Sequence, residues 1–293
     1  MILIIGASGQ LGDSLAKLCT AQGLDHVALA RPAVDLAQPE TLAAALTATK
    51  PTFVINAAAY TAVDNAESDE AAAMAGNHTG PKALAQLCAA ANAVLIHVST
   101  DYVFDGNKGA PYLETDATGP TGVYGRTKRD GETAILATPA KAVILRTAWV
   151  YSAHGKNFAR TMLTAGRKLP HLRVVADQRG TPTAAADLAA AILAIIARIR
   201  ETGWRAEYRG IFHATNQGET TWHGFAAAIF EEAAKQGYQP PHIEPITTAD
   251  WPTPTRRPPD SRLDCSKLRQ IFGVQLPPWR ASLPTIVGAL LQA

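Results

Sequence analysis

Three side chains whose types and spacing suit proton delivery to a carbonyl lie near the middle of the chain. Tyr124 and Lys128 are four residues apart, so in a helix they share one face about one turn apart. Thr100 follows the apolar run 94–98, which predicts a buried parallel strand ending at a ligand crevice. A hydroxyl, a phenol and an ammonium group can together bind and protonate a carbonyl oxygen. The alternatives are structural: a surface tyrosine, a solvated lysine and a helix-capping threonine.

The start of the chain predicts the element that brings a cofactor to these groups. The apolar run 2–5 leads into a loop with glycines at positions 6, 9 and 12, and a helical pattern follows. Strand, glycine loop and helix in this order predict a dinucleotide site. Gly6 permits the tight turn, Gly9 lets the backbone approach a pyrophosphate, and Gly12 lets the helix lie close to the strand. The alternative is an ordinary glycine-rich turn, because the spacing is not Gly-x-Gly-x-x-Gly.

The end of the second predicted strand, 26–30, indicates which nicotinamide cofactor binds. An acidic residue there would bind the ribose 2′-hydroxyl of NAD, but Arg31 occupies the position and can pair with a 2′-phosphate. We therefore predict NADPH, with NADH as the alternative if Arg31 is only a solvated surface charge. Asp35 and Leu36 come next and are placed to contact the adenine. Asp35 could instead cap the helix that begins near Pro39.

Apolar runs alternate with helical patterns along the first half of the chain. The runs predict strands at residues 2–5, 26–30, 53–56, 94–98 and 143–145. Between the third and fourth strands we expect one helix from residue 61 to about residue 91, with Asn77 facing the core. Strands that alternate with helices predict an α/β fold, a Rossmann-type doubly wound parallel sheet with a smaller C-terminal substrate-binding lobe.

The regularity loosens after residue 151, and the chain divides into two expected parts. Residues 1–153, plus about 184–215, are assigned to a dinucleotide-binding domain, and about 154–183 and 216–293 to the substrate-binding lobe. Two adjacent arginines, Arg256 and Arg257, lie in this lobe. They could hold a substrate phosphate, or they could form part of a solvated face.

Composition and charge exclude several classes of protein. A net charge of +2 without a basic stripe or tail carries no nucleic-acid signature. Cys19, Cys88 and Cys265 have no paired spacing, which argues against a disulfide framework or a zinc site and for a reducing compartment. The apolar start is too short for a membrane span and lacks the basic region of a signal peptide. We expect a cytoplasmic protein that binds neither nucleic acid nor a membrane.

Taken together, these motifs resemble the extended short-chain dehydrogenase/reductase family over nearly the whole chain. The glycine loop 6–12 and the Tyr124–Lys128 pair are shared widely in that family. More specific matches are the segments 59–64, 99–106 and 257–263. The resemblance implies NADPH-dependent reduction of the C4 ketone of a dTDP-linked sugar, dTDP-6-deoxy-L-lyxo-4-hexulose, in the supply of sugars for bacterial cell-surface polysaccharides.

The resemblance also implies roles for individual residues. Tyr124 would be the proton donor, Lys128 the partner whose ammonium lowers the pKa of the phenol from roughly 10, and Thr100 the orienting hydroxyl. The implied cofactor contacts are Gly6, Gly9, Gln10, Leu11, Gly12, Arg31, Asp35, Leu36, Ala57, Ala58, Ala59, Tyr124 and Lys128. The implied contacts with the sugar nucleotide are Val63, Thr100, Asp101, Tyr102 and Trp149. Trp149 could instead belong to the core.

Two alternatives to a reductase stay open. The first is an epimerase, a dehydratase or another ketoreductase acting on a nucleotide sugar; dehydratases add an acid pair beside the catalytic hydroxyl, whereas Thr100 is followed by Asp101 and Tyr102. The second is a non-catalytic regulatory subunit, which would not need the intact Thr-Tyr-Lys set. A homodimer is expected. Some members of the family form metal-linked dimers through a glutamate early in the first helix, but Asp13 and Ser14 stand there, so we expect no metal.

Overall fold

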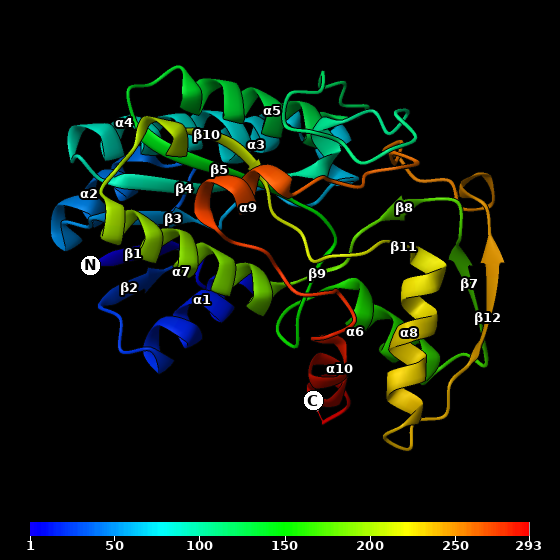
Figure 1. Cartoon of the computed structure of the whole chain (residues 1–293). Coiled ribbons are helices and arrows are strands. Elements are labelled where there is room, and N and C mark those ends of the chain that lie inside the picture. The colour runs from blue at the N-terminus through cyan, green and yellow to red at the C-terminus, as the bar shows by residue number, and fades with distance from the viewer. Residues whose placement is uncertain (293) are drawn as a thin grey trace.

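A six-stranded, all-parallel sheet forms the centre of the molecule. The computed structural model describes residues 1–292 of the chain (Figure 1). The strands are β1 (Ile2–Ile5), β2 (His26–Leu29), β3 (Phe53–Asn56), β4 (Val94–Thr100), β5 (Lys141–Thr147) and β10 (Gly210–His213), in the order β10-β5-β4-β3-β1-β2. The chain leaves β1 toward β2 on one side and returns to β3 on the other, so the strand order reverses between β1 and β3. Ligands of such sheets bind outside the strand ends at this reversal.

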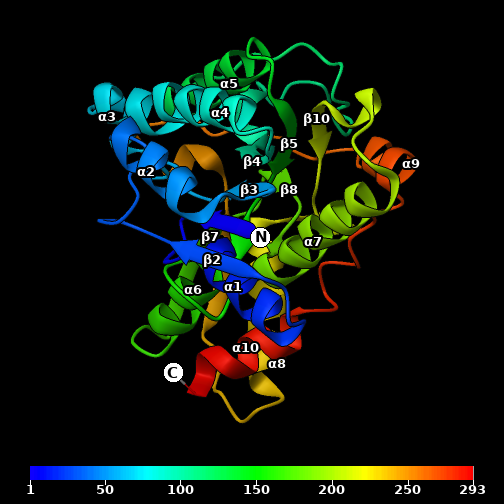
Figure 2. The same cartoon turned by 90° about the vertical axis from the view of Figure 1, so that its left-hand side faces the viewer.

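Helices cover both faces of the sheet, which confirms the predicted doubly wound fold. One face carries α1 (Gln10–Ala21), α7 (Ala185–Thr202) and α9 (Ser266–Phe272); the other carries α2 (Pro39–Thr49), α4 (Gly80–Ala90) and α5 (Val123–Leu136). Figure 2 shows α2, α4 and α5 on one side of the strands and α1 and α7 on the other. Alternate residues of β1 enter the two cores, Ile2 and Ile4 on one side and Leu3 and Ile5 on the other, because successive strand side chains point to opposite faces.

The single helix expected over residues 61–91 is wrong: the segment is broken into four parts. They are η1 (Asn65–Glu67), α3 (Glu70–Met74), the π-helical turn η2 (Ala75–Thr79) and α4. Helix α3 begins where the Asp69 carboxylate accepts a hydrogen bond from the Ala72 N–H at 3.3 Å. Pro81 has no N–H to offer the Asn77 carbonyl four residues earlier, which accounts for the wider turn at this point. Asn77 is fully buried, as predicted.

A smaller lobe with its own core lies below and to the right of the sheet in Figure 1. It contains the helices α6 (Phe158–Gly166), α8 (Trp222–Ala234) and α10 (Leu283–Gln292), and the strand pair β7 (His171–Val175) and β12 (His242–Ile246). Two further short pairs are β6 (Val150–Tyr151) with β9 (Thr183–Ala184), and β8 (Arg179–Gly180) with β11 (Thr220–Thr221). The remaining 3₁₀ turns are η3 (Asp101–Val103), η4 (Ala206–Tyr208) and η5 (Thr248–Asp250).

Helix α9 packs with the sheet, although its residues fall in the C-terminal segment that the sequence assigned to the lobe. Leu268 and Phe272 of α9 are buried in the same core as α1 and α7. The chain therefore crosses from the lobe back to the sheet before it ends in α10. Among residues 1–292, no helix combines the length and the apolar character needed to cross a lipid bilayer.

Candidate active site

A cleft of about 960 Å³ lies at the carboxyl ends of the strands and reaches the smaller lobe. The expected site residues that line it are Gly6, Gly9, Gln10, Leu11, Arg31, Asp35, Leu36, Ala57, Ala58, Ala59, Val63, Thr100, Asp101, Tyr102, Tyr124, Lys128 and Trp149. Gly12 is the one expected site residue that does not line the cleft. The fold thus brings the groups expected to bind a cofactor and those expected to bind a sugar nucleotide into one continuous space.

The glycine loop is packed so closely that side chains could not be added to it. Gly6 has a φ of +91°, and a Cβ atom there would lie 2.7 Å from the backbone nitrogen of Ala58. A Cβ atom on Gly12 would lie 2.1 Å from the carbonyl oxygen of Gly6, so Gly12 allows α1 to approach the end of β1. Gly9 is the N-cap of α1 and provides no capping side chain. The open first turn of α1 therefore faces the cleft, the arrangement that suits a phosphate.

The residues after β2 form the far end of the cleft. Arg31 is exposed and lines the cleft, which leaves its guanidinium available to a 2′-phosphate. The Asp35 carboxylate accepts a hydrogen bond from the Ala37 N–H at 3.0 Å. The N-cap of α2 is Gln38, and no side chain caps it. The alternative that Asp35 caps α2 is therefore wrong, because the loop places the carboxylate one turn too early.

Thr100, Tyr124 and Lys128 all line the cleft, and each is almost completely buried. Thr100 is the last residue of β4, and Tyr124 and Lys128 lie on α5. The Thr100 hydroxyl donates to the Asp101 carboxylate at 3.0 Å and accepts from the Tyr102 N–H at 3.2 Å, so it caps η3 while it also lines the cleft. The Lys128 ammonium donates to the Val98 carbonyl oxygen at 2.6 Å.

Burial has a larger effect than neighbouring charges on the pKa values of Tyr124 and Lys128. Burial raises the pKa of the Tyr124 phenol well above its ordinary value, and a hydrogen bond with Thr100 opposes this rise. Burial lowers the pKa of Lys128 to about 8, and the Glu132 carboxylate opposes this fall. In this structure Lys128 does not lower the pKa of Tyr124, since its ammonium donates to the Val98 carbonyl oxygen. The expected stabilisation by Lys128 and the oxidised nicotinamide concerns the phenolate after proton transfer, and it stays a prediction. Tyr124 holds its proton firmly at neutral pH.

Polar residues from three parts of the chain meet next to Tyr124. Burial raises the pKa of Asp101 to about 6. The ring of Tyr102 packs edge-on against Tyr124, with centroids 5.6 Å apart. Arg257, from the C-terminal segment, donates to the Tyr102 hydroxyl at 3.1 Å and to the Asp64 carboxylate at 2.7 Å. Arg257 is therefore bonded to protein groups and is not part of a solvated face; its neighbour in sequence, Arg256, is exposed.

Trp149 lines the cleft from the end of β5, next to the smaller lobe. It has a φ of +47° and is partly exposed, so it is not a residue of the closed core. Its indole stacks on that of Trp222 from α8, with centroids 3.6 Å apart and planes at 11°. A Cβ atom on Gly180 of β8 would lie 2.6 Å from the Trp149 ring, so a glycine at this position leaves room for the indole.

Sequence reasoning missed several residues of the cleft. Trp222 lies in a helix that had no sequence signal for binding, and only packing of the two lobes reveals it. Thr147 ends β5 as Thr100 ends β4, and this shared position was the signal that could have found it. Its hydroxyl is buried without a hydrogen-bond partner in the described part of the chain. Lys156 is exposed and lines the cleft near the glycine loop.

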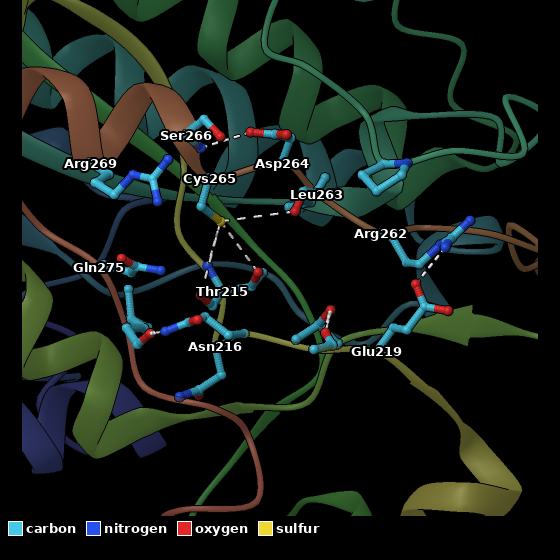
Figure 3. A pocket seen from close by; sticks show the side chains of 15 residues that line it. Thr215, Asn216, Glu219, Arg262, Leu263, Asp264, Cys265, Ser266, Arg269 and Gln275 are labelled. Atoms are coloured by element: carbon cyan, nitrogen blue, oxygen red, sulfur yellow. Dashed lines mark hydrogen bonds and ion pairs between the residues drawn. The ribbon is translucent and has the colours of Figure 1, made fainter.

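A second cavity of about 310 Å³ shares no lining residue with the cleft. In Figure 3, Cys265 lies at its centre, with its sulfur near Thr215 and Leu263, and Arg262 pairs with Glu219 at its edge. The charged groups of the cavity are of both signs, and Arg262 is already paired. Within residues 1–292 there is no group of three or more His, Cys, Asp or Glu residues that could hold a metal ion.

Comparisons with known proteins agree with this geometry. The family model described as the RmlD substrate binding domain matches residues 1–292. A dTDP-4-dehydrorhamnose reductase of Burkholderia thailandensis is 44% identical, over 99% of this chain and 99% of its own. The crystal structure of a dTDP-4-dehydrorhamnose reductase from Clostridium acetobutylicum has a TM-score of 0.90 at 36% identity, covering 100% of this chain and 99% of that one.

A second solved structure shows a related protein with a nucleotide bound. It is the dTDP-4-dehydrorhamnose reductase of Bacillus anthracis in complex with NADP, with a TM-score of 0.88 at 30% identity and coverage of 97% of both chains. The family model and these relatives span essentially the whole length of the chain described above. The chain therefore belongs to the family of the RmlD substrate binding domain, together with the dTDP-4-dehydrorhamnose reductases it resembles.

Proposed function

We propose that this protein uses NADPH to reduce the C4 ketone of dTDP-4-dehydro-L-rhamnose (dTDP-6-deoxy-L-lyxo-4-hexulose), giving dTDP-L-rhamnose. The observation that carries the proposal is the meeting of Thr100, Tyr124 and Lys128 in one cleft with the glycine loop. The names of the relatives, at 36% to 44% identity over nearly the full length, support the choice of sugar and nucleotide.

The cleft suits a dinucleotide at its glycine end. The backbone of Gly6 lies against Ala58 with no room for a side chain, and the first turn of α1 is open. Gln10 and Leu11 would hold the pyrophosphate through backbone N–H groups, while the Gly9 N–H donates to the Gly6 carbonyl oxygen at 3.0 Å and shapes the loop. Further contacts would come from Arg31, Asp35 and Leu36 at the adenosine end and from Ala57, Ala58 and Ala59 just after the end of β3. When bound, the reduced nicotinamide supplies the hydride that the ketone carbon accepts.

The chain's own residues would then manage the proton. As the C4 carbon is reduced, negative charge develops on its oxygen, and Tyr124 transfers its phenolic proton there to give the alcohol. Thr100 would donate a second hydrogen bond to the same oxygen. The phenolate left on Tyr124 is stabilised by the Lys128 ammonium until a proton returns. The raised pKa of Tyr124 keeps the phenol protonated beforehand, which a proton donor requires.

The sugar nucleotide would occupy the part of the cleft between Tyr124 and the smaller lobe. Val63, Asp101 and Tyr102 line one side of this space, and the stacked Trp149 and Trp222 line the other. Flat indole surfaces suit the apolar face of a 6-deoxy sugar or a thymine ring. We also propose a cytoplasmic location, which the three free cysteines support, because unpaired thiols are typical of reducing compartments.

The direct test follows loss of the NADPH absorbance band with enzymatically prepared dTDP-6-deoxy-L-lyxo-4-hexulose, with NADH in a parallel reaction. Oxidation that depends on the sugar, with dTDP-L-rhamnose as the product, is the expected result. If NADPH binds in a titration but the sugar causes no oxidation, another keto sugar is the substrate, or the chain is a regulatory subunit. An epimerase would instead convert the sugar without net consumption of NADPH.

A further inference from the structure

A buried carboxylate lies one helical turn beyond Lys128. Glu132 is 2% exposed, and its oxygens accept hydrogen bonds from the Ser99 hydroxyl at 2.5 Å and from Arg146 at 2.9 Å (Nε) and 2.7 Å (Nη2). Arg146 is also buried, and its guanidinium lies over the ring of Phe104 at 4.9 Å. The three polar groups thus form one compact network inside the protein.

The network is attached to every element that carries the proposed proton donor and its partners. Tyr124, Lys128 and Glu132 follow one another at intervals of four residues, so they lie along one face of α5. Ser99 precedes Thr100 on β4, and it pairs in register with Arg146 on β5. Glu132 therefore ties α5 to both strands at the level of the cleft.

Stability alone gives little reason to keep this ion pair. Removing two charges from water is expensive, and apolar residues of similar volume often stabilise a protein as well or better. In this protein the free-energy cost of burying the Arg146 charge is only partly offset, since its Nη1 is buried and has no hydrogen-bond partner among the described residues. A role in the neighbouring site accounts for a charge that packing does not require.

The titratable groups around Lys128 indicate that Glu132 acts on the charge of Lys128. On α5, Tyr124 and Glu132 lie one turn before and one turn after Lys128; His97 lies near Lys128 on β4, and Arg146 on β5 is bonded to Glu132. Burial keeps His97 neutral, because its pKa is well below the ordinary value, and the Lys128 ammonium lowers that pKa further. Glu132 is thus the negative group that opposes the burial of the Lys128 charge.

We propose that Glu132 is a positioning residue that keeps Lys128 charged and held on the α5 face beside Tyr124. The proposal rests on the proposed reduction and extends it to a residue outside the cleft. Glu132 lines no part of the cleft, so it acts through Lys128 and Ser99 rather than on the ligands.

The proposal predicts the direction in which the pH dependence of activity should change when Glu132 is replaced. The pKa of Lys128 is lowered to about 8, so the proton is present below that pH and is lost as the pH rises through it. Because Glu132 opposes this lowering, its loss would reduce the pKa further. The alkaline limb of activity would then move to lower pH, and each unit of that movement corresponds to about tenfold lower activity on the limb.

The experiment measures kcat/KM for the keto sugar at saturating NADPH over about pH 6 to pH 10, for wild type and Glu132→Gln. Since an unpaired Arg146 could unfold this variant, the double variant Glu132→Gln/Arg146→Gln is measured beside it. Both alkaline limbs should have lower midpoints than wild type, with the larger change in the single variant because Arg146 remains charged. The dissociation constant of NADPH should change little.

The matched control is Asp187→Asn in α7. Asp187 is also bonded inside the protein, to Ser282 at 2.7 Å and to Asn216 at 2.8 Å, but it lies outside the network. It should lose stability without a change in the alkaline midpoint. An unchanged midpoint in every folded Glu132 variant overturns the inference. An inactive wild-type protein that still binds NADPH overturns the proposed reduction instead.

Discussion

At the scale of single residues, Tyr124 shows the effect of burial on the phenol that we propose as the proton donor. The protein raises its pKa, so the proton stays in place until charge develops on a neighbouring oxygen. A group of this kind contributes mainly in the transition state and little to the binding of the cofactor.

Tyr124→Phe should therefore lower kcat by roughly 10²- to 10⁴-fold, the usual contribution of a positioned acid. The dissociation constant of NADPH, measured by fluorescence titration, should stay close to that of wild type. The substitution removes only the hydroxyl and keeps the ring that packs against Tyr102. A variant with wild-type turnover would exclude Tyr124 as the proton donor.

Arg31 tests the choice between the two nicotinamide cofactors. Its exposed guanidinium lines the cleft beyond β2, where a 2′-phosphate is the group that distinguishes NADPH from NADH. Arg31→Ala should raise the KM for NADPH by about tenfold to a hundredfold, the worth of a hydrogen bond to a charged group. The KM for NADH should change little. Equal increases for both cofactors would show that Arg31 does not bind the phosphate.

At the scale of elements, two glycines let α5 pack directly against the backbone of neighbouring segments. A Cβ atom on Gly131 would lie 1.9 Å from the carbonyl oxygen of Asn77 in the π-helical turn, and one on Gly125 would lie 2.1 Å from the carbonyl oxygen of Tyr102. Asn77 in turn bonds Tyr60 and Thr127. The broken helix and α5 thus form one closely packed unit that positions Tyr124 and Lys128.

Gly131→Ala should therefore be destabilising, although alanine in an exposed helix interior is worth about 1 kcal/mol more than glycine. Overpacking of this kind typically costs roughly 1–3 kcal/mol, and it should also lower kcat because α5 shifts. Gly288→Ala in α10 is the control, since a Cβ atom there meets only the flexible Gln236 side chain, at 3.1 Å. Urea unfolding of both variants makes the comparison; equal stabilities would contradict the close contact.

At the scale of the whole molecule, the cleft is completed by the smaller lobe. The Trp149–Trp222 stack joins the end of β5 to α8, and the Trp222 indole N–H donates to Gln178 at 3.1 Å. Arg257 makes a second connection, from the C-terminal segment to Tyr102 and Asp64. The position of the lobe therefore decides the shape of the part of the cleft proposed for the sugar nucleotide.

Trp222→Leu should raise the KM for the sugar nucleotide by about tenfold, since an aromatic stack is worth roughly 0.5–1.5 kcal/mol beyond its buried area. The NADPH dissociation constant should be unchanged, because Trp222 lies at the lobe side of the cleft. Trp251→Leu serves as the control: its side chain is 55% exposed and lines no part of the cleft. A similar KM in both variants would place the sugar nucleotide away from the indoles.

The sequence by itself determined the sheet and the chemistry of its edge. Strands buried on both faces appear as continuous apolar runs, so β1 to β5 could be predicted. The glycine loop and the Tyr124–Lys128 spacing are local patterns, and the structure places both at one cleft. Local patterns reach only a few residues along the chain. Pro81 removes only one backbone hydrogen bond. The helical pattern around it therefore predicted one continuous helix over 61–91, and the π-helical turn was not expected.

Only the tertiary structure decided what depends on contacts between distant segments. Trp222 meets Trp149 across a separation of 73 positions in the chain, α9 returns to the sheet, and Arg257 bonds to Asp64. The pKa of Tyr124 likewise depends mainly on burial by the surrounding elements, and this burial has a larger effect than any neighbouring group. Desolvation and packing are properties of the assembled molecule, and for that reason no spacing of residues in the sequence could predict them.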